Sequence, residues 1–122
     1  MEASARTTIV ALQLKPGYTA LICLDTKYIA GQMMLVRSFL AGMNMIATEP
    51  VANPFSTISQ HVDFAAFVPL QVDTMLRDNN TTELDTLTCA IIGGAALSDA
   101  LKEKLKKMRP SFFATYGMTE TI

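Results

Sequence analysis

The feature that most limits what this chain can fold into is an alternation of short apolar runs with longer segments of helical spacing. The runs are nearly uninterrupted and are bounded by polar, Gly or Pro residues, as in strands that are buried on both faces. We predict five strands, at residues 19–24, 43–48, 64–68, 88–92 and 111–116. The chain contains no internal repeat and no shift in composition, so residues 1–122 are predicted to form a single unit.

Segments of helical spacing separate these runs. Helices are predicted at residues 4–14, at 29–41, from 69 to a polar break at 79–82, and at 98–108. Gly42 is placed to end the second helix, and Pro69 begins the third because its missing N–H has no partner in a first turn. Ser98 is a suitable N-cap for the fourth. Strands joined by helices form parallel βαβ units, so the predicted fold class is α/β, a mainly parallel sheet with helices on both faces.

Charge and cysteine content exclude several classes of protein. The chain carries 10 Lys and Arg against 11 Asp and Glu, a balance that argues against a nucleic-acid partner. No apolar run approaches the roughly 18 residues that cross a bilayer, and the first residues do not resemble a signal peptide. Cys23 and Cys89 lie inside apolar runs, so we expect buried, reduced thiols in a cytoplasmic protein. With one histidine, His61, and no Cys-x-x-Cys pair, no structural zinc site is predicted.

The first candidate site is the segment from Tyr116 to Thr121, at the end of the last predicted strand. Ligands of open α/β sheets bind at the carboxyl ends of the strands. There Thr119 can donate a hydrogen bond to a phosphate oxygen, and Glu120 can supply an oxygen ligand to Mg²⁺. The same residues also suit an exposed turn with capping side chains, and spacing alone does not separate the two interpretations.

The second candidate site is the small-residue turn Gly93-Gly94-Ala95-Ala96, after the fourth predicted strand. Small residues let a planar ligand lie against the backbone, whose free N–H groups can meet acceptors. The turn is not a Gly-x-Gly-x-x-Gly fingerprint, and the chain has no Gly-x-x-x-x-Gly-Lys-Ser/Thr loop. A strand-to-helix turn built only for close packing has the same composition.

Taken together and in this order, the segments resemble the AMP-forming adenylate synthetases, the acyl-CoA synthetase and ligase family. Residues 116–121 match that family's Tyr-Gly-x-Thr-Glu motif, and residues 92–97 resemble its Gly-Gly-Ala-Pro-Leu turn, with Ala96 at the proline position. Residues 28–42 resemble the family's aromatic or histidine residue followed by a helix. Within the family, residues 28–37 are most similar to o-succinylbenzoate–CoA ligases of menaquinone biosynthesis. The resemblance runs from about residue 14 to the end of the chain.

The resemblance implies a nucleotide site. Tyr116 would stack on the adenine. The opposite wall would be the backbone of three residues, Gly93, Gly94 and Ala95. Gly117, which lets the chain turn sharply after the strand, is counted with the same site.

The resemblance also implies the groups that act on phosphate and acid. Thr119 would contact the α-phosphate, and Glu120 would bind the Mg²⁺ that neutralises charge as the adenylate forms. Tyr28 and Gly31 would lie at the acyl pocket. Many relatives carry a histidine in place of Tyr28, and a packed core tyrosine is an equal alternative.

The implied activity is that of an acyl-activating ligase, which makes an acyl-adenylate from ATP and a carboxylic acid and then a CoA thioester. ATP, Mg²⁺ and CoA are the implied cofactors and substrates, and o-succinylbenzoate is the implied acid. The family's triphosphate-binding loop, ribose-binding aspartate and catalytic lysine lie outside the resemblance. We therefore expect residues 1–122 to be an internal fragment of the large N-terminal adenylation domain, inactive alone and prone to self-association through an unpaired sheet edge.

Two other functions stay open. One is the same chemistry on another carboxylic acid, and the other is a non-catalytic, truncated α/β module that at most binds nucleotide. The lysines of residues 102–107 suggest a phosphate or nucleic-acid patch, but they spread around their helix, which favours a solvated face.

Overall fold

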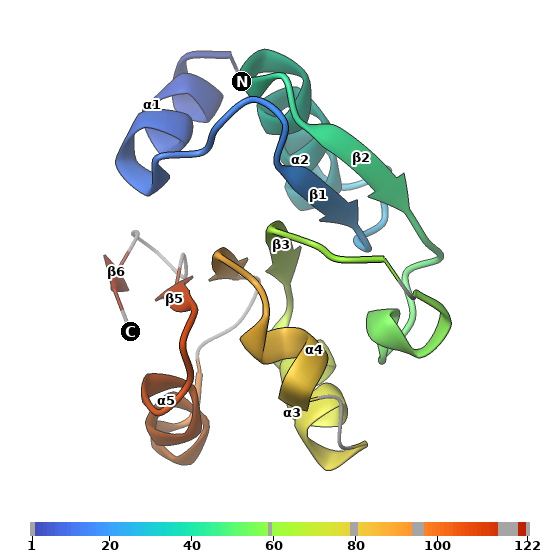
Figure 1. Cartoon of the computed structure of the whole chain (residues 1–122), viewed down its shortest axis with the longest axis vertical. Coiled ribbons are helices and arrows are strands. Elements are labelled where there is room, and N and C mark those ends of the chain that lie inside the picture. Colours follow the sequence, from blue (N-terminus) through green and yellow to red (C-terminus); the bar gives the residue numbers. More distant parts are fainter. Residues whose placement is uncertain (1, 59, 79–80, 94–96, 115–119, 122) are drawn as a thin grey trace.

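The computed structural model describes residues 2–58, 60–78, 81–93, 97–114 and 120–121, which fold around one six-stranded sheet (Figure 1). In chain order the elements are α1 (Glu2–Leu12), β1 (Thr19–Ile22), α2 (Ile29–Ala41), β2 (Asn44–Ala47), the 3₁₀ helix η1 (Pro54–Thr57), β3 (Phe64–Phe67), α3 (Pro69–Arg77), α4 (Thr81–Asp85), β4 (Cys89–Ile92), α5 (Asp99–Lys106), β5 (Ser111–Ala114) and β6 (Glu120–Thr121).

The strand order is β2-β1-β3-β4-β5-β6. The first five strands are parallel, and β6 runs antiparallel to β5. The predicted α/β fold with a mainly parallel sheet is therefore confirmed. Because β2 lies on one side of β1 and β3 on the other, the chain reverses its progress across the sheet between β1 and β3. In open α/β sheets such a reversal marks the place where ligands bind, outside the carboxyl ends of the strands.

Helices cover both faces of the sheet, because successive strand residues point to opposite sides. On one face, Ala20 and Phe64 belong to a core that includes residues of α1 and α2. On the other face, Leu21 and Phe67 belong to a core formed with α3, α4 and α5. The α1–α2 layer and the α3–α5 layer lie on opposite sides of the strands in Figure 1.

The predicted ends of the helices are confirmed where the sequence carries a specific signal. Gly42 ends α2 with a left-handed φ of 71°, and its N–H meets the carbonyl of Phe39. Pro69 occupies the first turn of α3. The Ser98 hydroxyl caps α5 by accepting the N–H of Leu101 at 3.2 Å.

Three sequence-based expectations differ from the structure. The predicted polar break at 79–82 does not include residues 81 and 82, because α4 begins at Thr81 and buries Leu84 in the core, while residues 79 and 80 lie outside the described residues. The short strand β6 was not expected, since two residues carry no periodicity. The first four expected strands are longer than the observed ones: β1 and β3 end earlier, β4 begins one residue later, and β2 is shorter at both ends. The predicted strand ends at Thr115 and Tyr116 lie outside the described residues.

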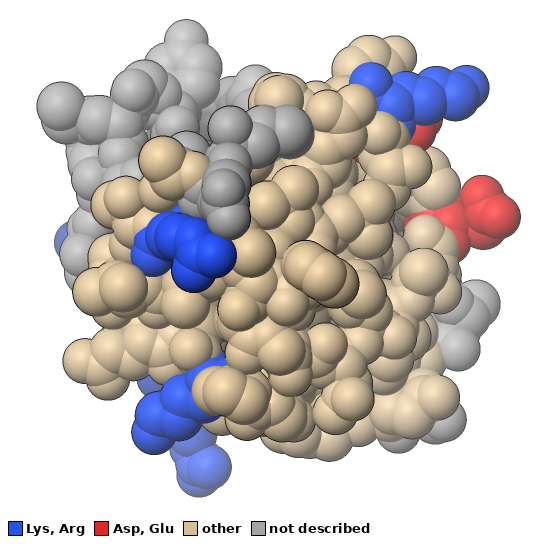
Figure 2. Space-filling model, turned by 90° about the horizontal axis from the view of Figure 1, so that it is seen from above, with Lys and Arg blue, Asp and Glu red and all other residues tan. Residues whose placement is uncertain are grey.

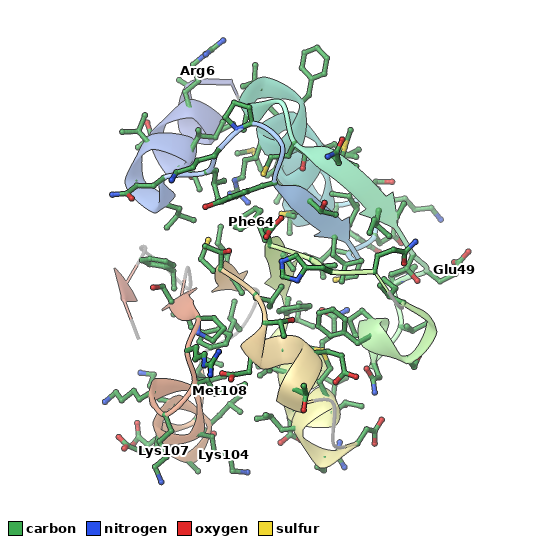
Figure 3. All side chains as sticks on the ribbon, in the orientation of Figure 1. Arg6, Glu49, Phe64, Lys104, Lys107 and Met108 are labelled. Carbon is green, nitrogen blue, oxygen red and sulfur yellow. The ribbon has the colours of Figure 1, made fainter. Side chains whose placement is uncertain are left out.

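The outer side of the α1–α2 layer is largely uncharged. Viewed from that side, the surface is a broad expanse without charged groups, with Lys and Arg mostly at its margins (Figure 2). Val10 and Phe39 are each 78% exposed, and Leu35 is also exposed. By contrast, Lys104 and Lys107 point away from the sheet at the far end of the molecule (Figure 3).

Candidate functional site

A cavity of about 300 Å³ opens where the chain reverses across the sheet, at the carboxyl ends of β1, β3 and β4 and beneath α2. Its walls are mostly apolar. The residues that line it are Leu24, Ile29, Ala30, Met33, Arg37, Ala66, Phe67, Val68, Ile91 and Gly93. Concave, mainly apolar cavities with one or two polar groups are the usual form of small-molecule sites.

The cavity exists because β1 and β3 separate. Their pairing consists of two residue pairs and ends at Leu21 and Ala65. The neighbouring β3–β4 ladder has four pairs and continues into the N–H of Gly93, which donates to the carbonyl of Phe67 at 3.0 Å. We call the line between residues 19–24 and residues 63–68 the β1–β3 seam. The small side chain of Ala66 leaves the α2 face open at the carboxyl end of this seam.

Arg37 is the charged residue among those lining the cavity. It comes from the middle of α2, and its Nε is buried without a hydrogen-bond partner among the described residues. Its Nη1 has a weak contact with the Met34 sulfur, at 4.0 Å. Burial lowers the pKa of the Arg37 guanidinium, because the charged group has lost part of its hydration. A half-buried guanidinium with an unused donor is suited to bind an anion.

The structure brings some of the predicted site residues to the cavity. Gly93 lines it directly. Tyr28 precedes α2 as its N-cap and is 69% exposed, so it is not a packed core tyrosine. Tyr28 and Gly31 lie next to the lining residues Ile29 and Ala30, and neither lines the cavity itself.

Gly31 has a packing role beside the cavity. A Cβ at this position would collide with the carbonyl of Asp25 and would lie 2.9 Å from the Cα of Thr26. The absence of a side chain therefore lets the turn before α2 lie against the first turn of that helix. This contact fixes how α2 begins at the mouth of the cavity.

Of the remaining predicted residues, the structure describes only Glu120. Gly94, Ala95, Tyr116, Gly117 and Thr119 lie outside the described residues. Glu120 lies in β6, where its backbone pairs with Ala114, the last residue of β5. Because Ala114 pairs with Ile92 at the carboxyl end of β4, Glu120 returns to the edge that carries Gly93.

Sequence reasoning missed two residues of this region. The sequence did carry a signal for Arg37, because it is a lone cation in a predicted helix that is otherwise rich in Met and Leu. Gln71 is one of two buried polar residues in the described chain, the other being Ser38. Its place three residues after the N-cap Val68 matches the Gln half of a capping box, but its contact with Cys23 after β1 could not be read from spacing.

The amino end of the seam carries a different polar cluster. One carboxylate oxygen of Asp63 accepts the N–H of Thr19 at 2.8 Å, and the other lies 2.8 Å from His61 Nε2. His61 is exposed, with a side chain 59% accessible, and pairs with Asp63. Among the described residues no three His, Cys, Asp or Glu side chains are grouped to hold a metal ion.

Both cysteines are free and buried. Burial raises the pKa of the Cys23 thiol to about 12. Burial, and then the charge of Asp63, raise the pKa of the Cys89 thiol to about 11. Neither thiol is therefore activated as a nucleophile at neutral pH. In the described part of the chain, no helix combines the length and apolar character that a membrane span requires.

Comparison with known proteins gives a consistent family. The family model described as AMP-binding enzyme matches residues 2–122. None of the curated proteins matches the chain. Among solved structures, the acyl-CoA synthetase (AMP-forming)/AMP-acid ligase II-like protein from Dyadobacter fermentans is 39% identical, with a TM-score of 0.88. That match covers 96% of this chain and 34% of the other.

Two further solved structures share the fold at lower identity. E. coli MenE with a bound analogue of OSB-AMS is 24% identical, with a TM-score of 0.77 over 98% of this chain and 26% of that one. Unliganded o-succinylbenzoate coenzyme A synthetase (MenE) from Bacillus subtilis is 22% identical, with a TM-score of 0.80 over 97% and 27% of the two chains. The chain thus spans about a third or less of the length of these structures.

Proposed function

This chain belongs to the AMP-binding enzyme family, and we propose that it works within an acid–thiol ligase that forms an acyl-adenylate from ATP and then a CoA thioester. The observation that carries the proposal is the apolar cavity at the β1–β3 seam, which ends at Gly93. Gly93 also begins the turn proposed as the adenine wall. The same residue therefore borders the acid and the nucleotide, which must meet for the acyl group to be transferred.

We propose nucleotide roles for the residues that follow β4 and β5. Tyr116 would stack on adenine against the backbone of Gly93, Gly94 and Ala95, with Gly117 providing the turn. The family motif at residues 116–120 and the position of Gly93 at the cavity support this assignment.

Thr119 and Glu120 are proposed to act on the phosphates. Thr119 would donate a hydrogen bond to the α-phosphate. The backbone of Glu120 lies at the carboxyl edge of β5, and a carboxylate is an oxygen donor of the kind Mg²⁺ prefers. Mg²⁺ held there would neutralise phosphate charge. These proposals are consistent with an active site at the carboxyl edge of the sheet.

The acid is proposed to be o-succinylbenzoate. An acid with an aromatic body and two carboxylates needs an apolar cavity, one carboxylate directed at ATP and a cation for the other. The cavity supplies apolar walls and the unpartnered Nε of Arg37. Tyr28 and Gly31 would shape its mouth, since they lie where α2 begins. Participation in menaquinone biosynthesis follows from this choice of acid.

The reaction then follows from the chemistry of the substrates. A carboxylate oxygen of the acid attacks the α-phosphorus of ATP, and pyrophosphate leaves. The sulfur of CoA next attacks the acyl carbonyl, and AMP leaves. The seam cavity holds the acid and excludes water from it, while Arg37 fixes the carboxylate that does not react. Positioning of this kind supplies a large share of the rate in bimolecular reactions.

The proposed ligase would act in the cytoplasm, a location that suits two buried, reduced thiols. We also propose that the 122-residue chain self-associates, because β2 is an uncharged edge strand and Phe39 on α2 is exposed. Sedimentation velocity across a concentration series tests this proposal. A monomer at all concentrations would contradict it.

The test of function is ATP–pyrophosphate exchange by the ligase that carries these residues. With o-succinylbenzoate we expect exchange that Glu120→Ala abolishes, and we expect none from the 122-residue chain alone. Arg37→Met should raise KM for o-succinylbenzoate by about ten- to a hundredfold, since hydrogen bonds to charged groups contribute about 1.5–3 kcal/mol. Arg77→Met, at an exposed helix position, is the control. Exchange only with monocarboxylic acids would favour another acid, and no exchange with any acid would contradict the proposed activity.

A further inference from the structure

The carboxyl end of the β1–β3 seam is bridged by the side chain of Gln71, which reaches it from the opposite face of the sheet. Gln71 is 4% exposed and sits in the first turn of α3. Its Oε1 accepts the N–H of Val68 at 3.0 Å. Its Nε2 donates to the carbonyl of Cys23 at 3.2 Å and to the carbonyl of Val51 at 3.0 Å.

These three bonds join the segments that diverge around the cavity. Val68 follows β3 and lines the cavity, and Cys23 precedes the lining residue Leu24. Val51 belongs to the loop after β2. Direct pairing of β1 with β3 has already ended at Leu21, so the carbonyl of Cys23 has no ladder partner on β3. The amide of Gln71 takes the place of the missing ladder bonds.

A second bond across the seam supports the bridge. The thiol of Cys23 donates to the carbonyl of Ala66, with Sγ and O 3.4 Å apart. Ala66 forms part of the cavity floor. The two strand ends are therefore held at a fixed separation from behind, although the seam between them is open on the α2 face.

We propose that Gln71 is a positioning residue that holds the seam cavity open in its ligand-binding shape. A helix cap needs only the bond from Val68, whereas the two bonds donated by Nε2 reach the residue after β1 and the loop after β2. Gln71 does not touch the cavity, so it acts on a ligand only through the backbone that it fixes. The relevance of this residue to catalysis rests on the proposed function, but the cavity can be probed without it.

Two substitutions on α3 separate positioning from general stability. Gln71→Leu keeps the size and burial of the side chain but removes all three hydrogen bonds. Met75→Ala is the matched control, because Met75 lies one turn further along α3, is fully buried and makes none of these bonds. Both variants are expected to lower the urea midpoint of the 122-residue chain.

The readout is binding of methyl benzoate, a neutral aromatic probe, together with amide hydrogen exchange. We expect Gln71→Leu to weaken methyl benzoate binding about tenfold, because a preorganised cavity is lost. Hydrogen exchange at the Val68 amide should be faster in Gln71→Leu than in Met75→Ala when the two variants are compared at denaturant concentrations that give them equal stability. Met75→Ala should bind the probe as wild type does.

Two outcomes would overturn the proposal. Equal probe affinity in Gln71→Leu and Met75→Ala would show that the bridge does not set the shape of the cavity. Failure of the wild-type chain to bind methyl benzoate would show that the cavity is not a ligand site. Binding of methyl benzoate without binding of o-succinylbenzoate would instead count against the proposed acid and leave the role of Gln71 supported.

Discussion

The two ends of the β1–β3 seam are built in opposite ways. At the amino end, Asp63 joins the strands through backbone and side chain, exchanging bonds with Thr19 and accepting the N–H groups of Thr88 and Cys89 at its carbonyl. At the carboxyl end, strand pairing is replaced by Gln71 and by the thiol of Cys23. The first end is closed by direct contacts, and the second is held apart by a bridge.

Side chains on the face of the sheet that α2 covers show the same contrast. Phe64 and Ala66 are two residues apart on β3 and point to the same face. Phe64 is fully buried and fills the amino end, where it lies in the interior of the molecule (Figure 3). Ala66 leaves the carboxyl end open beside Arg37. One strand thus supports close packing at one end and borders a cavity at the other.

The largest effect on stability is expected at the filled end. Phe64→Ala removes a fully buried ring and should lower the free energy of unfolding by about 3–5 kcal/mol. Urea denaturation measures the change. Phe39→Ala, at an exposed position on α2, should change it by less than about 0.5 kcal/mol. A loss below about 1 kcal/mol for Phe64→Ala would show that the amino end is not tightly packed.

Removing the Asp63 side chain, which joins the strands at the amino end of the seam, should have the next largest effect on stability. Asp63→Ala leaves the N–H of Thr19 without its carboxylate partner and should cost about 1–3 kcal/mol. Asp73→Ala, which breaks an exposed pair with Arg77, should cost less than about 1 kcal/mol. Because Asp63 lies at the far end of the seam from the cavity, binding of o-succinylbenzoate should not change. Weaker binding in Asp63→Ala would mean that the two ends are coupled.

High pH should probe one thiol at each end. In the folded chain the pKa is raised to about 12 for Cys23 and about 11 for Cys89, against 9.0 when unperturbed. Each raised pKa means that deprotonation of the thiol favours the unfolded chain. The free energy of unfolding is therefore unaffected below pH 9 and falls as pH rises above it, on the order of 1 kcal/mol per pH unit for each thiol. Urea denaturation between pH 8 and pH 11 measures the decline, and Cys23→Ala should make it shallower. An unchanged slope in Cys23→Ala would contradict the burial of this thiol.

The smallest effect on stability is expected from filling the open end. Ala66→Leu places a larger side chain into the cavity, so the free energy of unfolding should change by less than about 1 kcal/mol while o-succinylbenzoate binding is lost. Ala65→Leu points into the filled core on the other face and should cost about 1–3 kcal/mol. Calorimetric titration and urea denaturation measure the two quantities. Retained binding in Ala66→Leu would place the ligand elsewhere.

The same contrast explains what the sequence could predict. The strands and the helix ends at Gly42 and Ser98 were predictable, because local apolar runs and caps set them. The position of Gly93 directly after β4 was predictable, because a Gly-Gly pair follows the apolar run. The short elements α4 and β6 were not, since their formation depends on Leu84 entering the core and on pairing with β5.

The cavity itself could not be predicted from spacing. It arises because β1 and β3 separate after Leu21, which is a property of the strand order and not of either run. Arg37 becomes a site residue only when α2 lies over the open end of the seam. Gln71 becomes a bridge only when α3 packs behind β1. Such residues are brought together by tertiary structure and leave little trace in local pattern.

The most direct test of the ligand site is a titration of the ¹⁵N-labelled chain with o-succinylbenzoate, followed by amide chemical shifts. We expect saturable shifts at the carboxyl end of the seam, at Leu24, Val68 and Gly93, and none at Thr19, Asp63 and Thr88. In Arg37→Met the same amides should shift only at about tenfold higher ligand concentration. Shifts centred on the amino end, or no saturable shifts at any concentration, would contradict the assignment of the acid to the open end of the seam.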